Sequence, residues 1–332
     1  MEFLQNEMDD LGELGLTDGS KDDKIIVNIW IKYECRMDKT EYGMPRAEAK
    51  CMHVQSVDLY RFFNMTPPDG AAAQLRMWIP DLLPLGGGSR RRPAVLILPG
   101  GGYGHVSNRE LEPVALRFVA KGYAAFGLQY SCAPHRFPVA LREAAMAMKF
   151  IRQQAVEYLI NTHLVAAVGF SAGGHLCGTL GTLFDTPELS DLGSADQLRP
   201  DVLGLCYPVA VSWGKTHAGS FQNLTGGDAQ LSANLSLDRL VRPDMPPAFI
   251  WHTRLDASVP CRNSLLLATA MEEAGVDFAL HIYYRGCHGL SLADETVYPV
   301  GAVPPISSDV LDWVDAMLTF FEEQGLRMIS LE

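Results

Sequence analysis

Along most of this chain, segments whose apolar residues form short continuous runs alternate with segments whose apolar residues recur every three or four positions. Short continuous apolar runs are typical of buried strands, and recurrence every three or four positions is typical of helices with one apolar face. The runs that predict strands are residues 24–33, 75–79, 94–98, 123–129, 164–168, 202–206, 248–252 and 278–284. Helical periodicity covers residues 109–121, 138–154, 172–184, 262–274 and 308–324.

Strands that are apolar on both faces and alternate with helices predict an α/β fold with a mostly parallel central sheet and helices on both faces. Residues 208–247 interrupt this alternation with a polar, glycine-rich segment and one predicted helix over residues 232–240. We therefore expect a single domain over residues 24–332 with a small cap at about 208–247. Residues 1–23 form an acidic N-terminal extension whose order the sequence leaves open.

Composition narrows the classes of partner. The 332 residues are 48% hydrophobic and 20% charged, which suits a globular core, and the net charge of −12 argues against nucleic-acid binding. The start of the chain lacks the basic and apolar regions of a secretory signal, and no apolar stretch reaches membrane-spanning length. The seven cysteines form no C-x-x-C pair. We therefore expect a cytoplasmic protein without a nucleic-acid or membrane partner, and the sequence leaves a homo-oligomer open.

One segment carries a distinctive chemical signal. Gly169-Phe170-Ser171-Ala172-Gly173 follows a predicted strand and precedes a predicted helix. This is the G-x-S-x-G nucleophile elbow, a sharp turn in which the glycines avoid backbone collisions and the serine hydroxyl is displayed. Ser171 is the predicted nucleophile.

A serine needs a base to take its proton, and the base needs a carboxylate to orient it. His288 lies in a glycine-flanked loop after the last predicted strand, and Asp256 follows the strand over residues 248–252. The order Ser, Asp, His is that of α/β-hydrolases. The spacing therefore predicts His288 as base and Asp256 as its partner, and the less well placed rivals for the acid are Asp228, Asp277 and Asp294.

A glycine-rich loop supplies the remaining part of the predicted site. Pro99-Gly100-Gly101-Gly102-Tyr103 follows the strand over residues 94–98, where backbone N–H groups can hold an oxyanion. The predicted donors are Gly101, Gly102 and Ala172. Tyr103 and His105, just beyond the glycines, are candidate substrate-binding residues. No H-E-x-x-H motif or Cys/His cluster with zinc spacing occurs, so we predict no metal.

Together these motifs resemble the acetyl esterase and acetylxylan esterase branch of the α/β-hydrolases, which is related to hormone-sensitive-lipase-like esterases. The resemblance covers roughly residues 70–325 and rests on the glycine loop, the elbow, Asp256 and the pair His288-Gly289. Further matching positions are Arg109-Glu110, Pro113, Tyr130-Ser131, Pro134, Phe137-Pro138, Trp251-His252-Thr253 and Val259-Pro260. Two departures are Pro99, where a histidine is usual, and the N-terminal extension, which has no counterpart.

The resemblance implies a serine carboxylesterase that acts on short acyl groups, often acetyl esters of sugars, through an acyl-enzyme and without metal or organic cofactor. Its partner would be a small-molecule ester. Two other hypotheses remain open. One is a prolyl-oligopeptidase-like peptidase, which shares the elbow and the Ser, Asp, His order. The other is a non-catalytic binding protein on a hydrolase scaffold.

Overall fold

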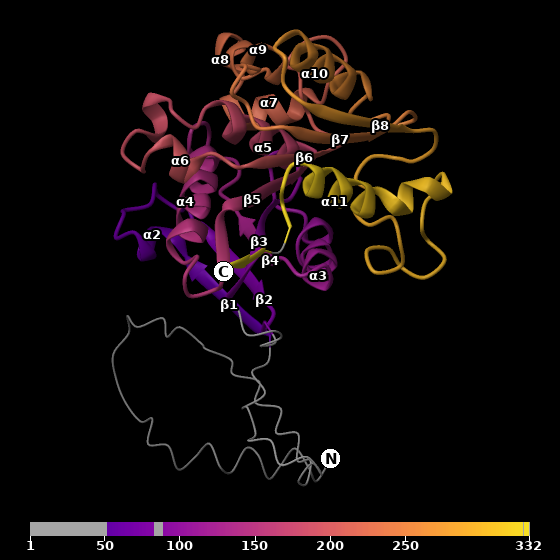
Figure 1. Cartoon of the computed structure of the whole chain (residues 1–332). Coiled ribbons are helices and arrows are strands. Elements are labelled where there is room, and N and C mark those ends of the chain that lie inside the picture. Colours follow the sequence, from indigo (N-terminus) through magenta and orange to yellow (C-terminus); the bar gives the residue numbers. More distant parts are fainter. Residues whose placement is uncertain (1–51, 83–88, 328, 332) are drawn as a thin grey trace, which may run out of the picture. The chain divides into compact units, whose positions relative to one another are not determined.

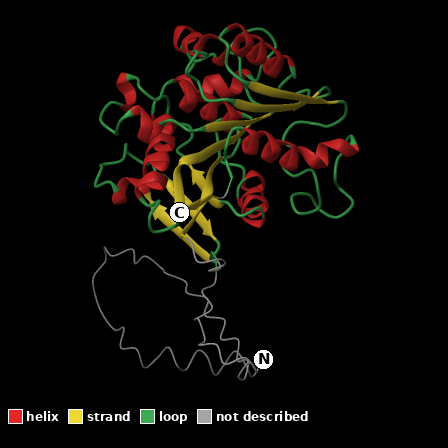
Figure 2. Cartoon of the chain, viewed as in Figure 1, coloured by secondary structure: helices red, strands yellow, loops and turns green. Residues whose placement is uncertain are grey.

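The structure is a computed structural model that describes residues 52–82, 89–327 and 329–331 (Figure 1). The predicted strand over residues 24–33 and the acidic extension over residues 1–23 lie outside the described residues. The described chain forms a sheet with helices packed against both of its faces (Figure 2). This confirms the predicted fold class.

The sheet has the strand order β1-β2-β4-β3-β5-β6-β7-β8, and β9 pairs with the beginning of β3. The strands are β1 (His53–Asp58), β2 (Gln74–Ile79), β3 (Ser89–Leu98), β4 (Ala124–Gln129), β5 (Ile160–Phe170), β6 (Val202–Cys206), β7 (Ala248–Thr253), β8 (Phe278–Tyr283) and β9 (Ile329–Leu331). All neighbours from β4 to β8 run parallel, whereas β1 pairs antiparallel with β2, and β2 with β4. The carboxyl ends of β5, β6, β7 and β8 therefore lie side by side.

Helices cover each face because the strands are apolar on both sides. They are α2 (Leu59–Phe62), α3 (Glu112–Ala120), α4 (Val139–Gln153), α5 (Ala172–Thr182), α6 (Ala195–Leu198), α7 (Ala218–Thr225), α8 (Ala229–Asn234), α9 (Leu237–Leu240), α10 (Arg262–Glu273) and α11 (Trp313–Glu323). In β3, Leu96 packs with the cluster that holds α4, α5 and α10. Its neighbours Val95 and Ile97 pack with α3 and α11 on the opposite face. The structure thus has two cores separated by the sheet.

The helix predicted over residues 232–240 is wrong. The structure has α8 and α9 there, with a break at Leu235 and Ser236. The Leu237 N–H donates to Ala210 O (2.8 Å), and the Ser236 hydroxyl accepts from the Ser212 N–H (2.9 Å). Because these residues bind the segment after β6, they cannot continue one helical hydrogen-bond ladder.

The other predicted elements differ from the structure mainly at their ends, and the helices α2, α6 and α7 were not predicted. A short 3-10 turn over Asn108–Glu110 precedes α3, which starts at Glu112 with Pro113 in its first turn. Proline suits this position because the first helical N–H groups have no partner inside the helix. Strand β1 was not predicted, since its sequence is largely polar and most of its residues are exposed at the antiparallel edge of the sheet.

Candidate active site

Ser171 occupies a strained turn between β5 and α5. Its φ of 53° and ψ of −117° are rare for a residue with a side chain. A Cβ on Gly169 would lie 2.1 Å from Gly173 O, and a Cβ on Gly173 would lie 2.0 Å from Leu98 O. Both positions therefore require glycine, and their close packing holds the serine in this conformation.

The structure brings the three predicted residues of the triad together. Ser171 Oγ lies 2.7 Å from His288 Nε2, and His288 Nδ1 lies 2.6 Å from Asp256 Oδ2. Ser171 follows β5, Asp256 lies in the loop after β7, and His288 lies in the loop after β8. Three side chains that are distant in the sequence thus meet at the carboxyl edge of the sheet.

Asp256 is held on several sides. Its Oδ1 accepts hydrogen bonds from the backbone N–H groups of Ser258 (2.9 Å) and Val259 (2.8 Å). His252 Nε2 lies 3.3 Å from Oδ2 and 2.7 Å from Val259 O, which requires a proton on that nitrogen. Burial alone would raise the pKa of the Asp256 carboxyl, but the hydrogen bonds from His252, His288 and Val259 outweigh it and place the pKa well below its usual value. The carboxylate is therefore ionised when it faces His288.

The other acids weighed for this role lie elsewhere in the structure. Asp228 caps α8 by accepting from the Leu231 N–H (2.9 Å), and Asp294 pairs with Arg117 (3.2 Å). Asp277 is exposed just before β8. None of the three is recorded in contact with His288.

The predicted oxyanion loop lies beside the serine. Gly101 and Gly102 adopt φ values of 126° and 64°, which glycine tolerates without strain. Within the described part of the chain, the N–H groups of Gly101, Gly102 and Ala172 have no recorded hydrogen-bond partner. A Cβ on Gly100 would lie 3.0 Å from Ser171 Cβ, so the loop and the serine are in close contact. The arrangement leaves these three donors available to a bound oxygen.

Glu110 anchors this loop, a role that was not predicted from the sequence. The buried carboxylate accepts from the Gly100 N–H (2.7 Å) and from the Tyr207 hydroxyl (2.7 Å). Tyr207 in turn accepts from the Ser291 N–H (2.9 Å) in the segment after His288. Glu110 therefore ties the glycine loop to the part of the chain that carries the base. In the sequence, Glu110 stood out only as one of the positions that match the family, which did not indicate this contact.

We expect Glu110 to make stability depend on pH. Burial raises the pKa of its carboxyl, although the bonds from Tyr207 and Gly100 oppose the rise. Between the ordinary pKa of glutamate and the raised pKa of Glu110, the folded state keeps a proton that the unfolded state has lost. The free energy of unfolding therefore falls as pH rises between these two pKa values. Glu110→Gln, which cannot ionise, should lose less stability than wild type as pH rises above about 4.

Urea unfolding at a series of pH values measures this difference. Glu157→Gln, which removes an exposed carboxylate, is the matched control and should keep the wild-type slope. Equal slopes for Glu110→Gln and wild type would contradict this account of Glu110.

A cavity of about 390 Å³ opens at the serine. It is lined by Gly101, Gly102, Gly104, His105, Ser107, Arg109, Glu110, Ser171, His217, Gly219, Asn223, His288 and Gly289. The predicted residue His105 is among them. Residues of the segment 208–247 also contribute: His217 and Gly219 line the cavity, and Asn223 Nδ2 donates to Gly102 O (2.9 Å).

The prediction that Tyr103 binds substrate is wrong. Tyr103 is only 3% exposed, and its hydroxyl donates to His175 Nδ1 (2.8 Å) beneath the loop. His175 Nε2 donates to Leu235 O (2.7 Å), and burial lowers the pKa of this histidine to about 4. Because Tyr103 has a φ of 57°, the chain turns there and directs the ring into the core rather than into the cavity.

His217 presents a defined donor to the cavity. The Ser220 N–H donates to His217 Nδ1 (3.2 Å), and the Ser220 hydroxyl lies 2.8 Å from the same nitrogen. A ring nitrogen that accepts a backbone N–H carries no proton, so the proton of the neutral ring is on Nε2. Burial, together with the nearby His288, lowers the pKa of His217 and favours the neutral ring. Among the described residues, no partner is recorded for Nε2, which leaves it free to donate to a substrate.

Two absences hold for the residues that the structure describes. No helix there is long and apolar enough to span a membrane. The same residues contain no group of three or more His, Cys, Asp or Glu side chains arranged to hold a metal ion.

Comparisons with known proteins identify relatives of this chain. The profile named BD-FAE matches residues 82–198, and that of the prolyl oligopeptidase family matches residues 142–319. The chain is 37% identical over 222 residues to endo-1,4-beta-xylanase B of Butyrivibrio fibrisolvens, covering 63% of this chain and 34% of that protein. It is 29% identical over 235 residues to an acetylxylan esterase of Xylanibacter ruminicola, covering 68% and 45%. The chain thus spans about a third to a half of these curated relatives.

A solved structure extends the similarity over most of the chain. The acetyl ester-xyloside bifunctional hydrolase from Caldicellulosiruptor lactoaceticus is 33% identical, with a TM-score of 0.72. The alignment covers 84% of this chain and 99% of that one.

An exposed serine on a strand-to-helix turn, facing a histidine after the last parallel strand, is the arrangement of one fold class. Fold and site together define an α/β-hydrolase. The chain belongs to the prolyl oligopeptidase family of α/β-hydrolases. Within it, the chain resembles the acetyl esterases and acetylxylan esterases. The predicted resemblance is confirmed.

Proposed function

We propose that this protein is a serine carboxylesterase that hydrolyses short-chain acyl esters, above all acetyl esters, through an acyl-enzyme. The observation that carries the proposal is the continuous set of contacts from Ser171 Oγ to His288 and on to Asp256, at the floor of an open cavity. A neutral imidazole within 2.7 Å of a serine hydroxyl can take its proton as the oxygen attacks a carbonyl carbon.

The reaction follows the general scheme of serine hydrolases. Ser171 Oγ attacks the ester carbonyl while His288 Nε2 takes the proton, and the negative oxygen is held by the N–H groups of Gly101, Gly102 and Ala172. His288 then gives the proton to the departing alcohol, and the acyl group stays on Ser171. A water molecule, deprotonated by His288, hydrolyses this acyl-enzyme. Asp256 orients His288 and stabilises its charged form throughout.

The acyl and alcohol parts are inferred from the cavity and from the relatives. Glycines and polar side chains line the cavity at the serine, and its lining residues include no long apolar side chain, which suits a short acyl chain. Two relatives carry names that refer to xylan, and one of them is an acetylxylan esterase. We therefore propose an acetylated carbohydrate as the substrate and the segment 208–247 as a small cap beside it. The five free cysteines among the described residues fit a reducing compartment such as the cytoplasm.

A series of p-nitrophenyl esters tests the acyl part. We expect kcat/KM to be highest for acetate and to fall as the chain lengthens. The release of acetate from acetylated xylo-oligosaccharides tests the alcohol part. Highest activity on long acyl chains, or no acetate release from any sugar ester, would contradict the proposed substrate class.

His217 should favour sugar alcohols. His217→Asn keeps an acceptor that can cap α7, but removes the Nε2–H donor from the cavity. We expect kcat/KM for acetylated xylo-oligosaccharides to fall about tenfold, the value of roughly one hydrogen bond, and to fall less for p-nitrophenyl acetate, whose leaving group has no sugar hydroxyl. Equal losses on both substrates would show that His217 does not contact the alcohol part.

The match to the prolyl oligopeptidase family profile favours a peptidase as the second candidate. Peptidases of this kind use the same order of nucleophile, acid and base, so the contacts at Ser171 do not distinguish the two. Two matched substrates distinguish them: an acetyl ester and an acetyl amide whose leaving groups differ only in the oxygen or nitrogen. Ester turnover well above amide turnover supports the esterase, and the reverse ratio supports the peptidase.

A further inference from the structure

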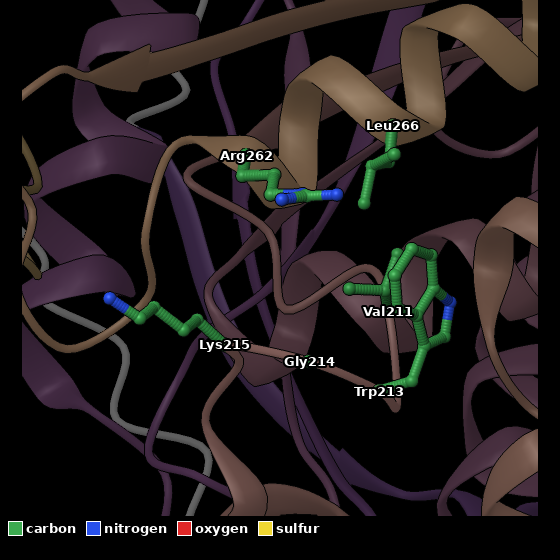
Figure 3. A pocket seen from close by; sticks show the side chains of 6 residues that line it. All are labelled: Val211, Trp213, Gly214, Lys215, Arg262 and Leu266. Atoms are coloured by element: carbon green, nitrogen blue, oxygen red, sulfur yellow. The ribbon is translucent and has the colours of Figure 1, made fainter.

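A second cavity, of about 270 Å³, lies between the segment after β6 and the first turns of α10 (Figure 3). It is lined by Val211, Trp213, Gly214, Lys215, Arg262 and Leu266. Trp213 is 40% exposed, although large aromatic side chains are usually covered. Figure 3 shows the Arg262 side chain reaching toward Leu266 and the indole, whereas Lys215 extends to the other side of Gly214.

The cavity is held in a fixed shape. Asn263, which is fully buried, accepts through Oδ1 from the N–H groups of Ala210 and Val211 (3.1 Å each) and from the Thr216 hydroxyl (3.2 Å). Its Nδ2 donates to Pro260 O (3.0 Å). The segment after β6 is thereby fastened to the start of α10, so the wall that carries Trp213 does not depend on a ligand for its position.

The chemistry of this cavity combines an aromatic platform with unneutralised positive charge. The Arg262 guanidinium lies 5.8 Å from the centre of the Trp213 ring. In the described part of the chain, neither Arg262 nor Lys215 has an acidic partner, although the chain as a whole carries a charge of −12. Asp238 contacts Trp213, but it forms no recorded ion pair with Arg262. Its two oxygens accept from Trp213 Nε1 (2.9 Å) and from the Ser236 hydroxyl (2.5 Å). Arg262 is thus available to a carboxylate, which its planar group can bind through two hydrogen bonds.

The cavity is close to the active site along the chain. Val211 is two residues from Val209, whose N–H donates to Ser171 O (3.0 Å). Lys215 is two residues from His217, which lines the cavity at the serine. Two residues span at most about 7 Å, so Lys215 of the second cavity and His217 of the first lie close together on one short stretch of chain.

We propose that this cavity is a subsite for a carboxylate-bearing sugar unit in the alcohol part of the substrate. The sugar ring packs on Trp213, its apolar edge faces Val211 and Leu266, and its carboxylate binds Arg262, with Lys215 adding positive potential. This inference rests on the proposed function, because it assigns an acidic branch to the same acetylated carbohydrate. It explains why an acidic protein keeps two unpaired cations and an exposed indole beside its active site.

Calorimetric titration tests the subsite without relying on catalysis. We expect wild-type protein to bind a xylo-oligosaccharide that carries glucuronic acid about tenfold more tightly than the neutral oligosaccharide of equal length, with the ratio falling at high salt. Arg262→Gln should bring the ratio close to one, and Lys215→Gln should lower it less. Arg61→Gln, which removes the same charge from α2, is the matched control and should keep the wild-type ratio.

Three results would overturn the subsite. They are equal binding of the acidic and neutral oligosaccharides, an unchanged ratio in Arg262→Gln, and equal binding of succinate, which would indicate a site for any carboxylate. Turnover of p-nitrophenyl acetate by the same preparations is measured separately. Absence of that turnover in the wild-type protein would count against the proposed function. Normal turnover together with equal binding of the acidic and neutral oligosaccharides would count against the subsite alone.

Discussion

Ser171→Ala is expected to lower kcat for p-nitrophenyl acetate by about five to six orders of magnitude while the protein folds normally. The loss is large because Ser171 is the hydroxyl that contacts His288 Nε2 among the described residues, and the remaining loop donors provide only a small rate over water. Folding should be preserved because alanine keeps the Cβ that this turn already accommodates at a φ of 53°. Initial rates at enzyme concentrations high enough to detect residual turnover measure the effect.

The control for Ser171→Ala is Ser190→Ala. Among the described residues, the Ser190 hydroxyl bonds only to Pro187 O (2.9 Å), at the surface and outside the cavity, so this variant should keep wild-type rates. Circular dichroism and thermal unfolding of both variants establish that each is folded. Appreciable turnover in folded Ser171→Ala would remove the serine from the mechanism.

Asp256→Asn should have the second-largest effect, a fall in kcat of about four orders of magnitude. The asparagine amide would donate to His288 Nδ1, which places the histidine proton on Nε2, where it can no longer accept the proton of Ser171. The fall measures the wrong tautomer rather than a lost fold, because asparagine can still accept from the N–H groups of Ser258 and Val259.

The same variant should change acid stability. Because the folded pKa of Asp256 lies below its unfolded value, the carboxylate stabilises the protein above the unfolded pKa, and this contribution is lost as pH falls through the folded value. Asp256→Asn should therefore lose less stability than wild type on acidification. Asp277→Asn, which removes an exposed carboxylate just before β8, is the control for both activity and pH dependence. Wild-type kcat in Asp256→Asn would assign the orienting acid to another residue.

Local spacing in the sequence predicted the elements that position the nucleophile. The apolar runs of β5 and β6 and the glycines around Ser171 are each contained in a few adjacent residues, so their structure follows from local sterics and burial. The order of Asp256 and His288 after the later strands could also be anticipated, because the carboxyl ends of parallel strands share one edge of the sheet.

Contacts between distant segments could not be predicted in the same way. Nothing near Glu110 indicates that it would bind Gly100 and Tyr207, since that contact depends on how the loop folds back over the sheet. His217 lies in a segment without clear periodicity, and its neighbour Thr216 is held by a bond to the distant residue Asn263. Tyr103 follows the glycines in sequence, yet the turn there buries it.

The most direct test of the central claim is labelling with a fluorophosphonate, followed by mass spectrometry of the digested protein. Such reagents react with a serine whose proton is removed by an adjacent base, and they require no knowledge of the substrate. We predict one covalent adduct, on the peptide that contains Ser171, and no adduct in Ser171→Ala. A folded wild-type protein that remains unlabelled, or that is labelled at a different serine, would contradict the account.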